Sequence, residues 1–75
     1  MKPYKNLGWD SGVTGYESGT DYIIVQFASG KDTLYTYTHA HTGILHVENM
    51  KKFADAGMGL NSYISTNKPL YSFKK

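Results

Sequence analysis

Three stretches of the chain between residues 13 and 38 have the composition of strands, and clusters of turn-forming residues separate them. Residues 22–27 are dense in β-branched and aromatic side chains, whereas residues 33–38 alternate hydroxyl-bearing and bulky side chains at period two. A shorter segment, residues 13–16, precedes them. Three strands joined by two short turns predict an antiparallel meander.

The same spacing predicts which side chains share a face of the sheet. Ile23, Val25 and Phe27 alternate onto one face of the second strand, and Tyr35 and Tyr37 onto one face of the third. A turn with an odd number of residues pairs odd positions with odd positions, whereas a two-residue turn would separate the two sets. We predict the odd turn, because it gathers the apolar side chains on one buried face.

After residue 42 the spacing of apolar residues changes from two to three or four. The apolar positions are Ile44, Val47, Met50 and Ala54. This pattern predicts an amphipathic helix over about residues 43–56, with Thr42 as its N-cap and Gly57 at its end. A short second helix, capped by Asn61 or Ser62, is predicted to follow.

These elements predict a small α+β domain in which a three-stranded antiparallel meander packs against one main helix and a short second helix. The domain is expected to span residues 13–67, after an irregular lead-in over residues 1–12 and before a tail over residues 68–75. A chain of 75 residues has little surface to bury, so several of its seven Tyr, three Phe and one Trp must belong to the core.

Composition excludes several classes of protein. The absence of cysteine excludes disulfides, thiolate zinc sites and cysteine nucleophiles. The N-terminal charges precede no apolar run, and no segment has the length of a membrane-spanning helix, so we expect a cytoplasmic, soluble protein. No nucleophile motif or flanking carboxylate pair is present, which predicts that the protein is not an enzyme and uses no cofactor.

The net charge of +2 is only mildly basic, and all eight basic residues are lysines. Lysine acts as a point charge, whereas arginine supplies the bidentate fork that reads guanine or clamps phosphate. The lack of arginine argues against a protein that reads the DNA groove sequence-specifically.

The order of several motifs resembles the KTSC domain, which is named for the C-terminus of some lysyl-tRNA synthetases. The residues that carry the resemblance are Tyr16, the pattern Ile23-x-Val25-x-Phe27, Gly30, the central Tyr35-x-Tyr37, Val47 to Lys52, and the run from Gly57 to Ile64. The similarity covers about residues 13–67. That family also occurs as small stand-alone bacterial and phage proteins. RNA binding has been suggested for it, so the resemblance implies RNA or a ribonucleoprotein as the partner.

Tyr35 and Tyr37 have two interpretations. Exposed aromatic rings on a sheet can stack unpaired bases, each stack contributing about 1–3 kcal/mol. Alternatively, both rings pack under the helix with the aliphatic side chains, and their hydroxyls reach the rim of the core. The face assignment favours packing, and partial burial would satisfy both interpretations.

The glycine-rich segment between the two helices also has two interpretations. Gly57, Gly59 and Asn61 could present free N–H groups to a phosphate at the start of the second helix. The lysines that could assist are Lys51, Lys52 and Lys68. Alternatively, the glycines end the first helix and a polar residue caps the second, which is the interpretation we favour.

The histidines form a possible metal site, because His39 and His41 alternate on one segment and His46 follows five residues later. A structural zinc ion usually needs four ligands, and no spacing indicates the carboxylates that would complete such a site. We therefore predict solvated histidines and no metal.

Two functions follow from these patterns. The first is a non-catalytic module that binds RNA or a ribonucleoprotein through the lysines, the two tyrosines and the glycine-rich turn. The alternative is a protein-interaction module, such as a small phage or bacterial protein that docks on and regulates a larger complex. Trp9 or Tyr4 would then be exposed anchors, since aromatic residues dominate interface hot spots.

Overall fold

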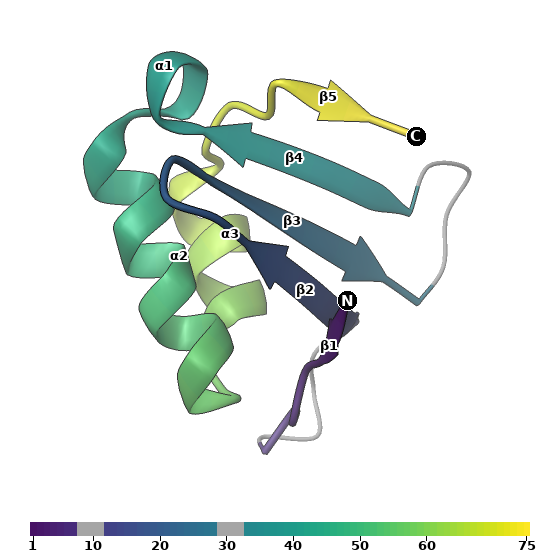
Figure 1. Ribbon diagram of the computed structural model, residues 1–75. Coiled ribbons are helices and arrows are strands. Elements are labelled where there is room, and N and C mark those ends of the chain that lie inside the picture. Colours follow the sequence, from purple (N-terminus) through teal and green to yellow (C-terminus); the bar gives the residue numbers. More distant parts are fainter. Residues whose placement is uncertain (8–11, 29–32) are drawn as a thin grey trace.

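The computed structural model describes residues 1–7, 12–28 and 33–75 (Figure 1). The elements are β1 (Lys2–Pro3), β2 (Val13–Ser18), β3 (Tyr22–Phe27), β4 (Leu34–Thr38), α1 (His39–Thr42), α2 (Ile44–Ala56), α3 (Leu60–Asn67) and β5 (Phe73–Lys74). The α+β class and the antiparallel sheet agree with the prediction.

The sheet has five strands in the order β1-β2-β3-β4-β5, so the prediction of three strands is wrong. The three central strands are the predicted ones. The outer strands come from the segments assigned to the lead-in and the tail, and each is two residues long. They join the sheet through backbone bonds, such as that from Tyr4 N–H to the Thr14 carbonyl at 3.0 Å and that from Lys75 N–H to the Leu34 carbonyl at 2.9 Å. Strands this short leave no periodic pattern in a sequence.

The pairing of β3 with β4 confirms the odd turn. Ile23 lies opposite Tyr37, and Val25 lies opposite Tyr35. The Phe27 N–H donates to the Thr33 carbonyl at 2.8 Å, which closes the hairpin. The apolar side chains of both strands therefore lie on one face, as the alternation predicted.

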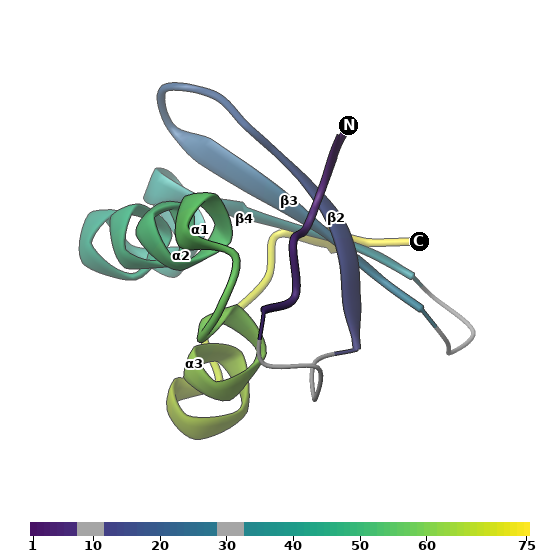
Figure 2. The same cartoon turned by 90° about the horizontal axis from the view of Figure 1, so that it is seen from below.

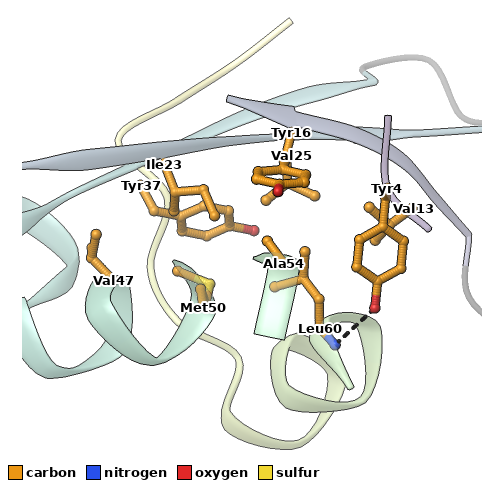
Figure 3. Close-up of a cluster of buried hydrophobic side chains, with 10 residues drawn as sticks. All are labelled: Tyr4, Val13, Tyr16, Ile23, Val25, Tyr37, Val47, Met50, Ala54 and Leu60. Carbon is orange, nitrogen blue, oxygen red and sulfur yellow. Dashed lines mark hydrogen bonds between the residues drawn. The ribbon is translucent and has the colours of Figure 1, made fainter. Parts of the chain in front are cut away.

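Both long helices cover that face of the sheet, and no helix of the described residues lies on the other face (Figure 2). On α2 the buried residues are Val47, Met50 and Ala54, in agreement with the predicted spacing, whereas Ile44, also predicted among the apolar positions, is 64% exposed. Figure 3 shows them packed below the side chains of the strands. The buried core consists of Tyr4, Val13, Tyr16, Ile23, Val25, Tyr37, Val47, Met50, Ala54 and Leu60.

The start of α2 differs from the prediction, because Thr42 is not its N-cap. The Thr38 hydroxyl accepts a hydrogen bond from His41 N–H at 3.3 Å and caps a separate short helix, α1. Gly43 then turns the chain into α2 with a φ of 107°, a value that favours glycine. The Thr42 hydroxyl instead donates to the Leu70 carbonyl. The histidine segment is therefore helical, not a loop.

The second helix also begins differently. Its N-cap is Gly59, with a φ of 90°, and neither Asn61 nor Ser62 caps it. Gly57 ends α2 in the left-handed conformation, as predicted. Two left-handed glycines in three residues reverse the chain tightly enough for α3 to pack beside α2.

Candidate nucleic-acid interface

Three aromatic rings meet on the helix-facing side of β4. The Tyr35 ring lies between Phe27, at 5.4 Å between centroids, and Tyr71, at 5.1 Å. Both contacts are edge-to-face, an arrangement that pairs of aromatic rings prefer. Phe27 and Tyr35 are half-buried, whereas the Tyr71 side chain remains 40% exposed. This set therefore offers an aromatic surface to a ligand.

Tyr71 is held in place by the residues on either side of it. The Leu70 carbonyl accepts a hydrogen bond from the Thr42 hydroxyl, and the Ser72 N–H donates one to the Thr36 carbonyl at 2.7 Å. The Ser72 hydroxyl is also 2.7 Å from that of Thr38. These bonds tie the segment before β5 to α1 and β4, so the Tyr71 ring is positioned by its backbone as well as by Tyr35.

A lysine completes this surface. The Lys74 ammonium lies 5.4 Å from the centroid of the Tyr71 ring, within the range of a cation–π contact. Lys74 pairs with Tyr35 across the two strands, which places both side chains on the same side of the sheet. We call Phe27, Tyr35, Tyr71 and Lys74 together the aromatic edge.

Tyr37 does not share this exposure, although it belongs to the same Tyr-x-Tyr motif. Its side chain is 2% exposed and packs in the core. Burial, followed by the neighbouring Tyr35 and Tyr71 phenols, raises the pKa of Tyr37 to about 12. For Tyr37 the burial agrees with the packing interpretation that the face assignment favoured, and not with a stacking role, because Tyr37 cannot reach a base without leaving the core.

The predicted lysines have different surroundings. Lys51 donates to the Thr20 carbonyl at 3.0 Å and lies 2.9 Å from a Glu48 carboxylate oxygen, so it ties α2 to the turn between β2 and β3. The Lys51 ammonium, and then His39, hold the pKa of Glu48 below its ordinary value. Lys52 and Lys68 are exposed. Lys51 therefore serves the fold, whereas Lys52 and Lys68 remain accessible to a ligand.

Two N–H groups of the glycine-rich turn are already bonded inside the fold. The Gly57 N–H donates to the Phe53 and Ala54 carbonyls at 3.0 and 3.2 Å. The Leu60 N–H donates to the Tyr4 hydroxyl at 3.3 Å inside the core. Gly59 lies directly against the Phe53 ring, and Asn61 is half-buried. Gly57 thus ends α2, as the favoured interpretation predicted, although no polar side chain caps α3. The Gly57 and Leu60 N–H groups are not available to a phosphate.

The histidines belong to separate networks. His39 Nε2 is 2.8 Å from a Glu48 oxygen, whereas His46 Nδ1 is 2.6 Å from the Tyr63 hydroxyl. His41 is exposed. Among the described residues, no group of three or more His, Cys, Asp or Glu side chains is placed to hold a metal ion.

Of the two predicted aromatic anchors, Tyr4 is 6% exposed. Its hydroxyl accepts from the Leu60 N–H, so Tyr4 joins the N-terminal segment to α3 and is not an exposed anchor. Trp9 lies outside the described residues.

The sequence patterns missed two members of the aromatic edge. Tyr71 and Lys74 lie in the segment assigned to a tail. The signal was present as the bulky residues Tyr71 and Phe73 at spacing two, followed by lysines, although four residues are too few to distinguish a strand from an irregular end.

Within residues 1–7, 12–28 and 33–75, no helix has the length and apolar character to cross a membrane. Comparison of the chain with protein-family models, curated proteins and solved structures found no match. The resemblance to the KTSC domain therefore rests on the sequence motifs alone.

Proposed function

We propose that this protein is a non-catalytic, KTSC-like module that binds single-stranded RNA, free or within a ribonucleoprotein, through the aromatic edge. The observation that carries the proposal is the exposed Tyr71 ring, held between Tyr35 and the Lys74 ammonium. Proteins that bind single strands combine such rings, on which bases stack, with cations that follow the phosphates.

Lysines close to Tyr71 in the sequence support a phosphate-binding role. Lys74 lies over the Tyr71 ring, and Lys68, three residues before Tyr71, is exposed. None of these cations is an arginine, so the binding we propose depends on stacking and point charges, with little base-specific reading. Affinity should then fall steeply with salt, by a slope of about −0.7 per phosphate contact for a single strand.

The family resemblance supports the same partner. The Tyr-x-Tyr motif contributes Tyr35 to the aromatic edge and Tyr37 to the core, so one motif supplies both a binding residue and its structural support. RNA as partner and a cytoplasmic location belong to the same proposal.

The test is fluorescence anisotropy with labelled single-stranded RNA, duplex RNA and single-stranded DNA at several salt concentrations. Tyr71→Ala should weaken binding to single-stranded RNA about five- to hundredfold, the equivalent of one lost stack. The matched control is Phe53→Ala, because Phe53 is an aromatic of similar exposure, 36%, on the helical surface. Lys74→Ala should also reduce the salt slope, whereas Lys52→Ala should leave it unchanged.

Two results would overturn the proposal. One is an absence of salt-dependent binding to all three nucleic acids. The other is an equal loss of affinity in the Tyr71 and Phe53 variants, which would place binding outside the aromatic edge.

A second candidate function is favoured by a separate observation. Leu45 is 74% exposed at the start of α2, and Leu70 is also exposed in the segment before β5. Where such side chains form a contiguous patch, they mark a surface that binds another protein. If the anisotropy test finds no RNA binding, a small phage or bacterial protein that docks on a larger complex becomes the better proposal.

A further inference from the structure

The segment that links α3 to β5 begins with a backbone conformation that its residue type does not favour. Lys68 ends α3 with a φ of 47° and a ψ of 55°, in the left-handed region, and its N–H donates to the Ile64 carbonyl at 2.9 Å. Residues with a Cβ rarely adopt this region, because the Cβ comes too close to the following carbonyl oxygen. Glycine is therefore the usual residue where a helix ends in this way.

The other positions with positive φ carry the residues that suit them. Among the described residues, these positions are Gly43, Gly57, Gly59 and Asn6, and asparagine also tolerates the left-handed region. Gly57 ends α2 in the same left-handed conformation in which Lys68 ends α3. The end of α3 does not require a lysine, so the lysine side chain should have a role of its own.

The Lys68 ammonium is available to a ligand. The side chain is exposed, and within residues 1–7, 12–28 and 33–75 no carboxylate or carbonyl group holds the ammonium. Lys51 differs, because Glu48 and the Thr20 carbonyl both hold its ammonium. Lys68 is therefore a cation that no ion pair of these residues neutralises.

The sequence places Lys68 three residues before Tyr71 and Lys74 three residues after it. Three residues span at most about 11 Å, and a lysine carries its charge at the end of a flexible four-carbon stem. The hydrogen bonds that hold Tyr71 in place also fix the path of the chain between the two lysines. α3 lies on the helix-facing side of the sheet, as the aromatic edge does, and not on the open face, which no helix of the described residues covers (Figure 2).

We infer that Lys68 is a phosphate-binding residue and that residues 68–74 take an internal nucleotide of a single strand. The base stacks on Tyr71, and the phosphates on its two sides bind Lys68 and Lys74. This inference rests on the proposed RNA binding at the aromatic edge and specifies its ligand, a nucleotide flanked by two phosphates and not a free base or nucleoside. The left-handed strain at Lys68 then persists because binding needs a cation there.

The variant Lys68→Gly separates a role in binding from a role in the fold. It should raise the melting temperature by about 2–6 °C, because glycine relieves the left-handed strain. It should also weaken binding to single-stranded RNA about three- to tenfold, because one phosphate contact is lost. A lysine that stabilised α3 through the dipole at its C-terminus would give the opposite shift in melting temperature. The matched control is Lys52→Ala, which removes the same charge from α2 and should leave the affinity within about twofold.

The salt dependence of binding tests whether two phosphates are bound. Fluorescence anisotropy with a labelled single-stranded RNA of about eight nucleotides gives the slope of log affinity against log salt concentration. Lys68→Gly and Lys74→Ala should each make this slope less steep by about 0.7. The double variant should make it less steep by about 1.4, because each lysine contacts a phosphate of its own.

The role of Lys68 and the proposed RNA binding can fail separately. Suppose that wild type binds the RNA and that Tyr71→Ala weakens binding. An unchanged affinity or a lower melting temperature in the Lys68→Gly variant would then overturn the role of Lys68 alone, as would an equal loss of affinity in the Lys52→Ala variant. A double variant with no larger change in slope than either single variant would overturn the two-phosphate ligand. An absence of salt-dependent binding by wild type would overturn both proposals.

Discussion

Successive side chains along β3 enter two different environments. Ile23 and Val25 point toward the helices and are fully buried, whereas Ile24, between them, lies half-buried on the open face. The two faces share the same backbone hydrogen bonds, so their difference comes entirely from what packs against them. The helix-facing side has the burial that stabilises the fold, and the open side keeps apolar surface that the fold does not need.

The same alternation divides β5. Lys74 lies beside Tyr71 on the helix-facing side, and Phe73 lies opposite Thr36 on the open side. One two-residue strand thus contributes a side chain to each face of the sheet. Its place in the sheet depends on backbone bonds to β4 and on the contacts of Ser72.

The two faces of the sheet should differ most in how much they contribute to the free energy of unfolding. Changing Ile23 and Ile24 separately to alanine compares them. Ile23→Ala empties a fully buried site and should lower the free energy of unfolding by about 2–5 kcal/mol. Ile24→Ala should lower it by about 1 kcal/mol, because that side chain is only half-buried and its removal leaves no enclosed cavity. Urea denaturation at low temperature measures both. Equal losses would mean that the open face is also part of the core.

The buried tyrosine predicts a loss of stability in strong alkali. The pKa of Tyr37 is raised from 10.0 to about 12, so the unfolded chain loses this proton first. The stabilisation is complete below pH 10 and is lost as the pH rises toward 12, up to about 2–3 kcal/mol. Tyr37→Phe should remove most of this alkaline loss of stability. The remainder should come from Tyr16, because burial also raises the pKa of Tyr16.

Denaturation midpoints measured from about pH 9 to 12 provide the comparison. The control is Tyr22→Phe on the open face, which should lose stability at alkaline pH as wild type does. If the Tyr37 and Tyr22 variants lost stability in parallel with wild type, the burial of Tyr37 would not be the cause.

The threonines of β4 should have a smaller effect. The Thr38 hydroxyl accepts from His41 N–H and bonds the Ser72 hydroxyl, so Thr38→Val removes two hydrogen bonds at once. We expect a loss of about 1–2 kcal/mol in the free energy of unfolding, whereas Thr36→Val should be nearly neutral. Thermal melting of the two variants is sufficient. A destabilised Thr36 variant with an unchanged Thr38 variant would contradict this account of how β5 is attached.

The smallest effect should come from the ion pairs that Glu48 on α2 makes with Lys51 and His39. Lys51 and then His39 lower the pKa of Glu48, so their stabilisation is present above the unfolded pKa of Glu48 and is lost as the pH falls through its folded pKa. The side chains are partly exposed, so the contribution is small. Glu48→Gln should remove this acid-side dependence. If the Glu48→Gln variant lost stability at acid pH as wild type does, other carboxylates would be the cause.

The sequence predicted the elements that repeat a pattern over several residues. β3, β4 and α2 bury one face at period two or at three-to-four spacing, and their register and burial agree with that spacing. β1 and β5 are too short to repeat anything. The cap at Thr38 and the turn at Gly43 depend on where the chain must go next, which a local pattern does not contain.

The candidate site was less predictable than the fold. Tyr35 was identified from its motif, but its partner Tyr71 lies 36 positions further along the chain and reaches it only after α3 and Pro69 redirect the backbone. The division between Tyr35 and Tyr37 also depends on the helices, since both tyrosines occupy the same face of β4. Spacing indicates the face, and tertiary packing decides which ring stays accessible.

The most direct test of the central proposal is a titration of the isotope-labelled protein with single-stranded RNA, followed by the chemical shifts of its backbone amides. The account predicts that the amides of Tyr35, Tyr71 and Lys74 shift as RNA is added, while those of Ile24 and Thr36 stay in place. Tyr71→Ala should abolish the shifts without changing the spectrum of the core. Shifts confined to the open face, or no shifts at any RNA concentration, would contradict RNA binding at the aromatic edge.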